Sequence, residues 1–283
     1  MENISFEKVF EKRNPKYTFL ISRMRCAMDL NEITFKDINS VNLRLFKDYM
    51  EGEVSNNSLK TYMAVVKATI SELFNDGLIE NGKCISVLKV KSEPQQNVCL
   101  SDDEIKMFED YYNRLDNSVH NRVKKDVLTL FLIEIFTGAR GCDVENFTPD
   151  NICNGTLTYV SKKTHTLTTL PAHKMLPQLI KNIPKRKYQR MTKNRIIKQI
   201  GKECGITHNV SLFYHGKQRT LPKYEFLAFH CARRSFVSSL IDRGVPISAV
   251  SKMAGHSDIS ITQRYYVSQT FDLPDEALSF FND

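Results

Sequence analysis

Two histidines, two adjacent arginines and two adjacent tyrosines occur in one segment, HCARRSFVSSLIDRGVPISAVSKMAGHSDISITQRYY, which begins at His230. His230 and Arg233 are three residues apart, so on a helix they share a face, whereas Arg234 points elsewhere. Each residue type also has an ordinary use, because histidines often form structural hydrogen bonds and helical tyrosines usually pack. A strongly basic segment directly upstream favours chemistry over packing.

Chemistry at a phosphate group suits this set of side chains. Negative charge develops on the non-bridging oxygens, and the planar guanidinium of arginine contacts two oxygens at once and keeps its proton. A tyrosine hydroxyl can attack if its surroundings favour the phenolate, and a lysine can protonate the leaving oxygen. The sequence shows no cluster of carboxylates suited to magnesium. We therefore expect a reaction that uses no metal and no other cofactor.

Glycine and proline divide the segment into three helices. Gly244 and Pro246 end the helix of the two arginines and start a second helix. Gly255 ends that second helix as a residue in the left-handed conformation. His256 is therefore expected in a turn, and the polar residues after it can cap a third helix, which carries Tyr265.

The positive charge of the chain is concentrated in one region. The formal net charge is +8, but residues 151–234 contain seventeen lysines and arginines against two acids, which makes +15 for that region alone. Such a surplus suits a polyanion, and no basic amphipathic helix with an aromatic, apolar face points to a membrane surface. Nucleic acid is the expected partner.

The seven cysteines are scattered, odd in number and never spaced as CxxC, which indicates reduced thiols. A zinc site built from Cys204, His208, His215 and Cys231 matches the spacing of no common zinc finger. No apolar run approaches the roughly 20 residues needed to span a bilayer, and the charged N-terminus lacks the apolar region of a secretory signal. We expect a cytoplasmic protein.

The pattern of apolar residues predicts a mainly α fold in two domains. Residues 1–90 carry helical stripes, one of them starting at the proposed N-cap Ser58. A polar, proline-containing linker covers 91–100, and a second domain over 101–283 opens with a helix start at Ser101. Within 152–172, β-favouring residues and the turn Asn154-Gly155 predict a small antiparallel sheet. Helices are expected again over 174–183 and 192–203.

Four blocks, in order, resemble those of the tyrosine recombinases, also called phage-type integrases. TGARGCDV is similar to the first arginine box and places Arg140 and Asp143. SKKTHTLTTLP is similar to the family's β-hairpin and places Lys163, with the adjacent Lys162 as the alternative. The other two blocks are HCARRSF, which resembles the His-x-x-Arg box, and AGHSDISITQRYY, which resembles the Gly-His box followed by the nucleophile helix.

Small departures from the family pattern touch no matched catalytic position. Cys231-Ala232 replaces a more usual acidic-Leu pair, and Arg234 stands where histidine is common. The family's usual gap of nine residues after the second histidine selects Tyr265 rather than Tyr266. The N-terminal 90 residues, chiefly SLKTYMAVVKATISELFNDGLI, resemble the family's helical core-binding domain, and residues 101–283 its mostly helical catalytic domain with a small antiparallel sheet.

The resemblance implies a role for each matched residue. Tyr265 would attack a DNA phosphodiester and form a 3′-phosphotyrosyl link. Arg140 and Arg233 would bind the non-bridging oxygens together with His256. His230 would act as the base, and Lys163 would protonate the leaving 5′-oxygen. Asp143 would orient the site.

The resemblance also implies partners. Double-stranded DNA would be cut and rejoined in a homo-tetramer on paired sites, with accessory DNA-bending or directionality proteins as further candidates. The tail after Tyr265, with Leu273, Leu278, Phe280 and Phe281, would dock on a neighbouring subunit or on its own domain. Such an enzyme would be encoded by a bacterium, a phage or a mobile element and would serve integration, excision, inversion or dimer resolution. A type IB topoisomerase and a non-catalytic DNA-binding regulator remain alternatives.

Overall fold

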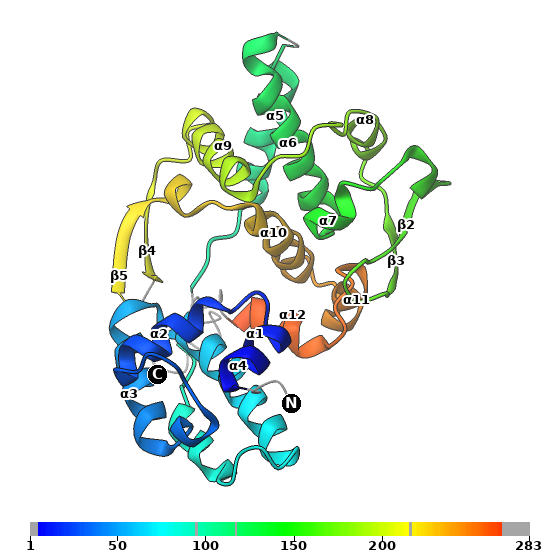
Figure 1. The fold of residues 1–283 in the computed structure, drawn as a ribbon. Coiled ribbons are helices and arrows are strands. Elements are labelled where there is room, and N and C mark those ends of the chain that lie inside the picture. Colours follow the sequence, from blue (N-terminus) through cyan, green and yellow to red (C-terminus); the bar gives the residue numbers. More distant parts are fainter. Residues whose placement is uncertain (1–4, 94–95, 117, 215–216, 268–283) are drawn as a thin grey trace, which may run out of the picture. The chain divides into compact units, whose positions relative to one another are not determined.

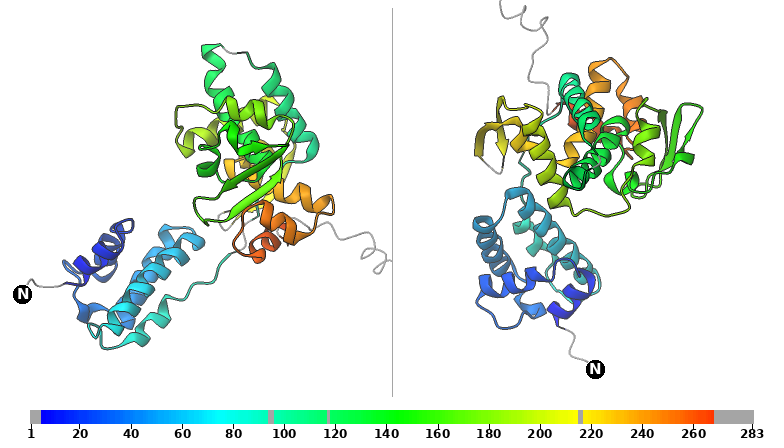
Figure 2. Two further views of the ribbon diagram at one scale, coloured as in Figure 1. Left: turned by 90° about the vertical axis from the view of Figure 1, so that its right-hand side faces the viewer. Right: turned by 90° about the horizontal axis from the view of Figure 1, so that it is seen from above.

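The structure of the chain is a computed structural model that describes residues 5–93, 96–116, 118–214 and 217–267, with 214, 217 and 264–267 described by their backbone alone. It divides into two compact units (Figures 1 and 2). The first comprises Met1–Gln95 with Phe213–Lys217, and the second comprises Gln96–Leu212 with Gln218–Asp283.

The first unit is a group of helices around its own apolar core. In the longest helix the buried residues Leu59, Met63, Val66, Ile70 and Leu73 recur every three or four positions and form one stripe. The elements are α1 (Phe6–Arg13), α2 (Phe19–Met28), η1 (Phe35–Asp37), α3 (Ser40–Glu53), α4 (Asn56–Asn75) and η2 (Gly82–Leu88).

The start of α4 differs from the sequence prediction. Its N-cap is Ser55, not Ser58, and the Ser55 hydroxyl accepts the backbone N–H of Ser58 at 3.4 Å. The asparagines that follow Ser55 are therefore the first turn of the helix rather than the end of a loop. Both serines suit a cap by type, so residue preference alone did not separate them.

The second unit is built on one long helix, α6 (Val119–Thr137), whose second half is buried on all sides. It ends where the sequence predicts, because Gly138 takes the left-handed conformation with φ +62°. Ahead of it, α5 (Asp102–Arg114) begins at the predicted residue. The Ser101 hydroxyl accepts the Glu104 N–H at 3.2 Å, and the Glu104 carboxylate accepts the Ser101 N–H at 2.8 Å.

Shorter helices pack around α6, and α10 has the most extensive contact with it. Figure 1 shows these helices. They include α8 and α9, which fall in the two ranges predicted to be helical, although α9 starts two residues earlier than expected. The elements are α7 (Gly141–Val144), η3 (Pro149–Asn151), α8 (Leu176–Lys181), α9 (Arg190–Glu203), η4 (Lys223–Phe226), α10 (Phe229–Asp242), α11 (Ile247–Met253) and α12 (Ile259–Val267).

A three-stranded antiparallel sheet with strand order β1-β2-β3 projects from this unit. Its strands are β1 (Ile152–Cys153), β2 (Thr156–Val160) and β3 (Leu167–Pro171). Asn154 and Gly155 join the first two strands with φ values of +49° and +74°, as a tight hairpin turn requires. The sheet predicted over 152–172 is thus confirmed.

A second hairpin was not predicted. Strands β4 (Asn209–Tyr214) and β5 (Lys217–Pro222) pair with each other, and the Ser211 and Thr220 hydroxyls lie 2.6 Å apart across them. Most of the hairpin is exposed, but Val210 and Leu212 pack on the core of the second unit, so the alternation from Asn209 to Leu212 is a short strand signal in the sequence. The mainly α fold with small antiparallel sheets is confirmed, and among the described helices none is long and apolar enough to cross a membrane.

Candidate active site

The first arginine of the proposed site is held where α6 meets α7. Arg140 is the N-cap residue of α7. Its Nη1 donates to the Ser161 hydroxyl at 3.0 Å and to the Gly255 carbonyl at 3.4 Å. One side chain therefore joins three parts of the chain that lie far apart in sequence: the end of α6, the β2–β3 turn and the turn before α12.

Asp143 ties the β2–β3 turn to the first arginine box. Its buried carboxylate accepts the Ser161 hydroxyl at 3.1 Å and the Lys162 backbone N–H at 2.9 Å. Ser161 thus accepts from Arg140 and donates to Asp143, and it links the two matched residues of the box. The carboxylate therefore holds the backbone of the lysine-bearing turn.

Arg233 is the fifth residue of α10 and is only 2% exposed. Its Nη1 donates to the carbonyl of Gly138, the residue that ends α6. Arg234, the next residue along the helix, is partly exposed. The structure therefore separates the adjacent arginines as the helical spacing predicts.

His256 lies in the turn between α11 and α12 and is 8% exposed. Its Nδ1 is 2.8 Å from the Thr262 hydroxyl, one turn into α12. Burial, followed by the positive charges of Arg233 and Arg140, lowers the pKa of His256 to about 3. The ring is therefore neutral at physiological pH.

The left-handed residue that ends α11 is Gly255, as predicted, with φ +62°. A Cβ atom added there would lie 2.9 Å from the Thr168 hydroxyl of β3. Glycine thus allows the turn before α12 to lie directly against the sheet, while the Gly255 carbonyl accepts the hydrogen bond from Arg140.

His230 is the second residue of α10, and its side chain is exposed. Desolvation by the surrounding protein, followed by the charges of Arg234, Arg233, Arg190 and Arg140, lowers the pKa of His230 to about 4. The ring is therefore neutral at physiological pH, and one ring nitrogen has a lone pair available as an acceptor.

The two remaining predicted residues are less closely defined. Lys163 lies exposed in the β2–β3 turn, next to the residue whose backbone Asp143 holds, and within the described part of the chain it makes no hydrogen bond to the arginines. Lys162 is also exposed. Tyr265 belongs to α12, and its side chain lies outside the described residues, as does the tail from residue 268 onward.

Several residues that the motif analysis did not single out support the site. Ser161 and Thr262 lie inside blocks that resemble the family motifs. Their hydroxyl groups, which can form hydrogen bonds, are the feature of the sequence that could have identified them. Glu134 lies in the largely apolar second half of α6 and is 4% exposed. Among the described residues, no group of three or more histidines, cysteines or acids is placed to hold a metal ion.

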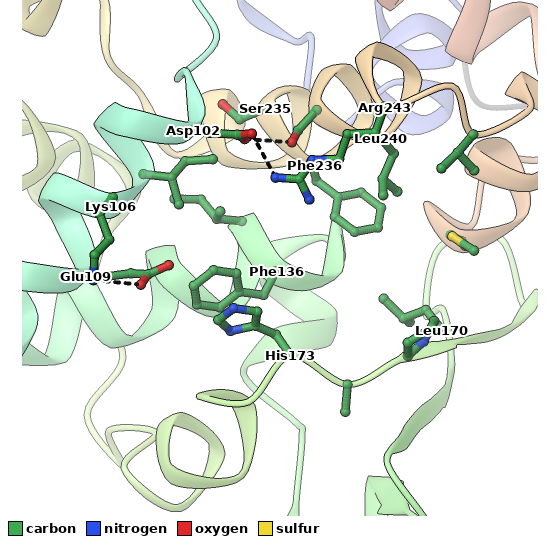
Figure 3. A pocket seen from close by; sticks show the side chains of 17 residues that line it. Asp102, Lys106, Glu109, Phe136, Leu170, His173, Ser235, Phe236, Leu240 and Arg243 are labelled. Carbon is green, nitrogen blue, oxygen red and sulfur yellow. Dashed lines mark hydrogen bonds and ion pairs between the residues drawn. The ribbon is translucent and has the colours of Figure 1, made fainter.

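A separate pocket of about 590 Å³ lies in the second unit (Figure 3). Its walls come from α5, α6, the end of β3, α10 and α11, and His173 stacks on Phe136 inside it with ring centroids 3.8 Å apart. Phe236, another wall residue, packs so closely on Gly138 that a Cβ there would lie 2.3 Å from its ring. The pocket and the acceptor of Arg233 therefore share a wall.

Known proteins share both the sequence family and the fold. Residues 70–271 match the phage integrase family, and residues 7–87 match the phage integrase SAM-like domain. A XerC-like tyrosine recombinase of Caldanaerobacter subterraneus subsp. tengcongensis is 38% identical over 55 residues, and tyrosine recombinase XerC of Treponema denticola is 46% identical over 44 residues. These matches cover 19% and 16% of this chain, and 14% of the length of each relative.

Solved structures resemble the chain over nearly its whole length. The Tn1549 transposon integrase in complex with a circular intermediate DNA aligns with a TM-score of 0.66 at 15% identity, covering 98% of this chain and 99% of that one. A lambda integrase dimer bound to a COC′ core site gives 0.68 at 13% identity, with coverage of 96% and 79%. XerH bound to its difH substrate gives 0.67 at 16%, with coverage of 98% and 84%. Because the phage integrase match spans more than half of its residues, the chain belongs to the phage integrase family, the tyrosine recombinases.

Proposed function

We propose that the chain is a site-specific DNA recombinase that cuts and rejoins DNA through a covalent 3′-phosphotyrosine. The observation that carries the proposal is the hydrogen bond from Arg140 to the Gly255 carbonyl, which joins the first arginine box to the turn of His256 before α12, the helix of Tyr265. Arg233, whose charge acts on the His256 ring, would add a second cation for the negative charge that develops on a phosphate in transfer.

The reaction balances with groups of this chain. Tyr265 Oη attacks the phosphorus and gives its proton to His230, whose lowered pKa keeps the ring free to accept it. The bond from phosphorus to the 5′-oxygen breaks, and Lys163, or Lys162 in its place, protonates that oxygen. Arg140, Arg233 and His256 bind the non-bridging oxygens. Reversal of the step with a new 5′-hydroxyl rejoins DNA, because the phosphotyrosine keeps the energy of the broken bond.

Double-stranded DNA is the proposed partner. The charge of +15 over residues 151–234 supports it, and most of these side chains would contact phosphates and position the duplex. The related Tn1549 and lambda integrases have been solved bound to DNA. We also propose a tetramer on two paired sites, encoded by a mobile element and acting in the cytoplasm, with accessory DNA-bending or directionality proteins as candidate partners.

The nucleophile can be tested with a matched pair of variants. Nicked duplexes made from the DNA that flanks the gene lose the cut strand by diffusion, so the covalent complex accumulates and is seen on a denaturing gel. We expect wild-type protein and Tyr266→Phe to form the adduct and Tyr265→Phe to form none. The released strand should carry a 5′-hydroxyl that a polynucleotide kinase labels directly.

Other results would contradict these assignments. An adduct with Tyr265→Phe but not with Tyr266→Phe would move the nucleophile by one residue. Efficient relaxation of any supercoiled plasmid by the monomer, without dependence on a site, would favour a type IB topoisomerase. Site-specific DNA binding without any adduct from the wild type would favour a non-catalytic regulator.

A further inference from the structure

A buried carboxyl group lies beneath the two arginines and belongs to none of the matched motifs. Glu134 interrupts the apolar run DVLTLFLIEIF and is 4% exposed in α6. Burying an ionisable group costs free energy unless neighbouring charges or hydrogen bonds compensate for it. The neighbours of Glu134 therefore indicate what the residue does.

The closest of these neighbours is the backbone that carries Arg140. A Cβ atom added to Gly141, the next residue, would lie 2.9 Å from Glu134 Oε1. That separation is shorter than such contacts allow, so any side chain at position 141 would displace the carboxyl group. The carboxyl oxygen thus packs directly on the first residue of α7, immediately after the arginine.

Lys193, from α9, brings a positive charge to the same place. Its Nζ would be 3.9 Å from a Cβ at Gly141, and it lies 3.1 Å from the Glu145 carboxylate just after α7. The ammonium group also lies 5.0 Å from the centroid of the Phe229 ring in α10. Its side chain is only 12% exposed, so the pair with Glu145 is largely shielded from water.

The second arginine reaches this cluster from α10. Arg233 donates to the carbonyl of Gly138, and the Gly138 N–H in turn donates to the Glu134 carbonyl at 2.8 Å. The charged groups that act on the Glu134 carboxyl are Lys193, Arg233 and Glu145. Burial raises the pKa of Glu134 to about 8; Lys193 and Arg233 oppose the rise, and Glu145 adds to it.

We propose that Glu134 is a positioning residue for Arg140 and Arg233. Its carboxyl group holds the backbone at Gly141 by direct packing and, with Lys193, joins α6, α7, α9 and α10 under the site. Because it contacts neither DNA nor the reacting atoms, it acts only through the two arginines. The inference rests on the proposed recombinase function, since its effect is read in the covalent step.

The test compares Glu134→Ala with Glu134→Gln in single-turnover adduct formation, at saturating protein, on the nicked flanking duplexes. We expect Glu134→Ala to slow the step by about 10- to 100-fold, because small displacements of catalytic groups have effects of this size. Glu134→Gln keeps the shape and the polar atoms and should stay within about 3-fold of wild type at pH 7. Affinity for DNA should change by less than about 3-fold in both, since phosphate contacts elsewhere dominate binding.

The dependence of the rate of adduct formation on pH distinguishes a positioning role of Glu134 from a role in packing alone. Above pH 8 the carboxyl group of Glu134 is ionised in the wild type, and its negative charge offsets part of the positive charge of Arg233. The rate of wild type relative to Glu134→Gln should therefore fall between pH 7 and pH 9. A purely structural residue would give parallel profiles for the two proteins. This comparison needs only the Gln variant and therefore stands even if Glu134→Ala does not fold.

Glu104→Ala is the matched control, because Glu104 is another buried acid of the same unit and pairs with Lys223 at 2.6 Å. It should lower the melting temperature and leave the single-turnover rate unchanged. A Glu134→Ala protein that behaves in the same way, together with parallel pH profiles, overturns the inference. Absence of any adduct from the wild type overturns the proposed function itself, so the wild-type reaction distinguishes the two failures.

Discussion

The side chain of His256 is fixed in both charge and orientation. With a pKa of about 3 the ring carries a single proton at neutral pH, and Thr262 lies 2.8 Å from Nδ1. When the threonine hydroxyl donates to Nδ1, the proton of the ring resides on Nε2. Nε2 is then a neutral donor that can bind a phosphate oxygen while the arginines alone supply positive charge.

Removing the hydroxyl of Thr262 should allow the proton of the His256 ring to reside on either nitrogen. Thr262 is fully buried, so Thr262→Val keeps its volume but leaves Nδ1 without this partner. We expect adduct formation to slow by about 10-fold, the lower end of what a single polar contact contributes to proton transfer and charge stabilisation. Long-range ¹⁵N–¹H spectra of the imidazole should show a mixture of tautomers.

Thr262→Ser is the control, because it restores the hydroxyl and should restore both the rate and the single tautomer. Equal rates for the valine and serine variants would show that the Thr262 hydroxyl does not orient the ring.

At this scale the sequence predicts the reacting groups better than their supports. The blocks that resemble the family motifs identify Arg140, Asp143 and Arg233, because each of these positions requires one particular type of side chain. The hydrogen bonds that hold them join residues far apart along the chain, such as Arg140 to Ser161. Only folding brings such partners together, and a local pattern carries no information about them.

Among the elements, the junction between α6 and α7 places the first arginine and supports the second. Gly138 ends α6 in the left-handed conformation, packs on Phe236 and offers its carbonyl to Arg233. A residue with three such constraints tolerates little change. The end of this helix could be predicted because a glycine after a long apolar run is a strong stop signal.

Gly138→Ala should destabilise the second unit by about 2–4 kcal/mol, combining backbone strain with overpacking against Phe236. Chemical denaturation monitored by circular dichroism measures this change. Gly155→Ala is the matched control, because Gly155 has φ +74° but no atom within 4 Å of an added Cβ. It should cost only about 1 kcal/mol, and equal losses in the two variants would contradict the crowding at Gly138.

Other elements were harder to predict because their signals are weak or shared. Ser55 and Ser58 both suit a helix cap, and only the structure shows which one ends the loop. The β4–β5 hairpin gives only a short strand signal, because the alternation of polar and apolar residues covers just Asn209 to Leu212 and β5 is mostly polar. In contrast, Asn154-Gly155 between β-favouring residues indicates a tight turn between two strands and nothing else. The sheet lies where this pattern predicts it.

For the whole molecule the uneven charge is the main determinant of how it meets DNA. Each phosphate contact releases condensed counterions, so the logarithm of the affinity falls with the logarithm of salt concentration by about 0.9 per contact. The charge of +15 over residues 151–234 therefore predicts a steep dependence on salt. The net charge of +8 alone would predict a weaker dependence of the affinity on salt concentration.

Replacing residues 185–187, the exposed basic run before α9, with glutamine should make the salt dependence shallower by about 1 to 3. Fluorescence anisotropy of a labelled duplex at several salt concentrations measures this slope. The control replaces Lys106, Arg114 and Arg122, three exposed cations outside the basic region, and should change the slope by less than about 1. Equal changes in both triple variants would show that net charge, not its location, governs binding.

The turn at Gly255 has a mechanical consequence. Its backbone lies against Thr168 of β3, and its carbonyl accepts hydrogen bonds from Arg140 and, at 3.5 Å, from the Thr164 hydroxyl. The sheet cannot slide toward this turn without pushing the start of α12. In the proposed reaction, a DNA strand that pulls on the lysine-bearing turn would also shift the helix of Tyr265, so that contact with the leaving group and alignment of the nucleophile would be coupled.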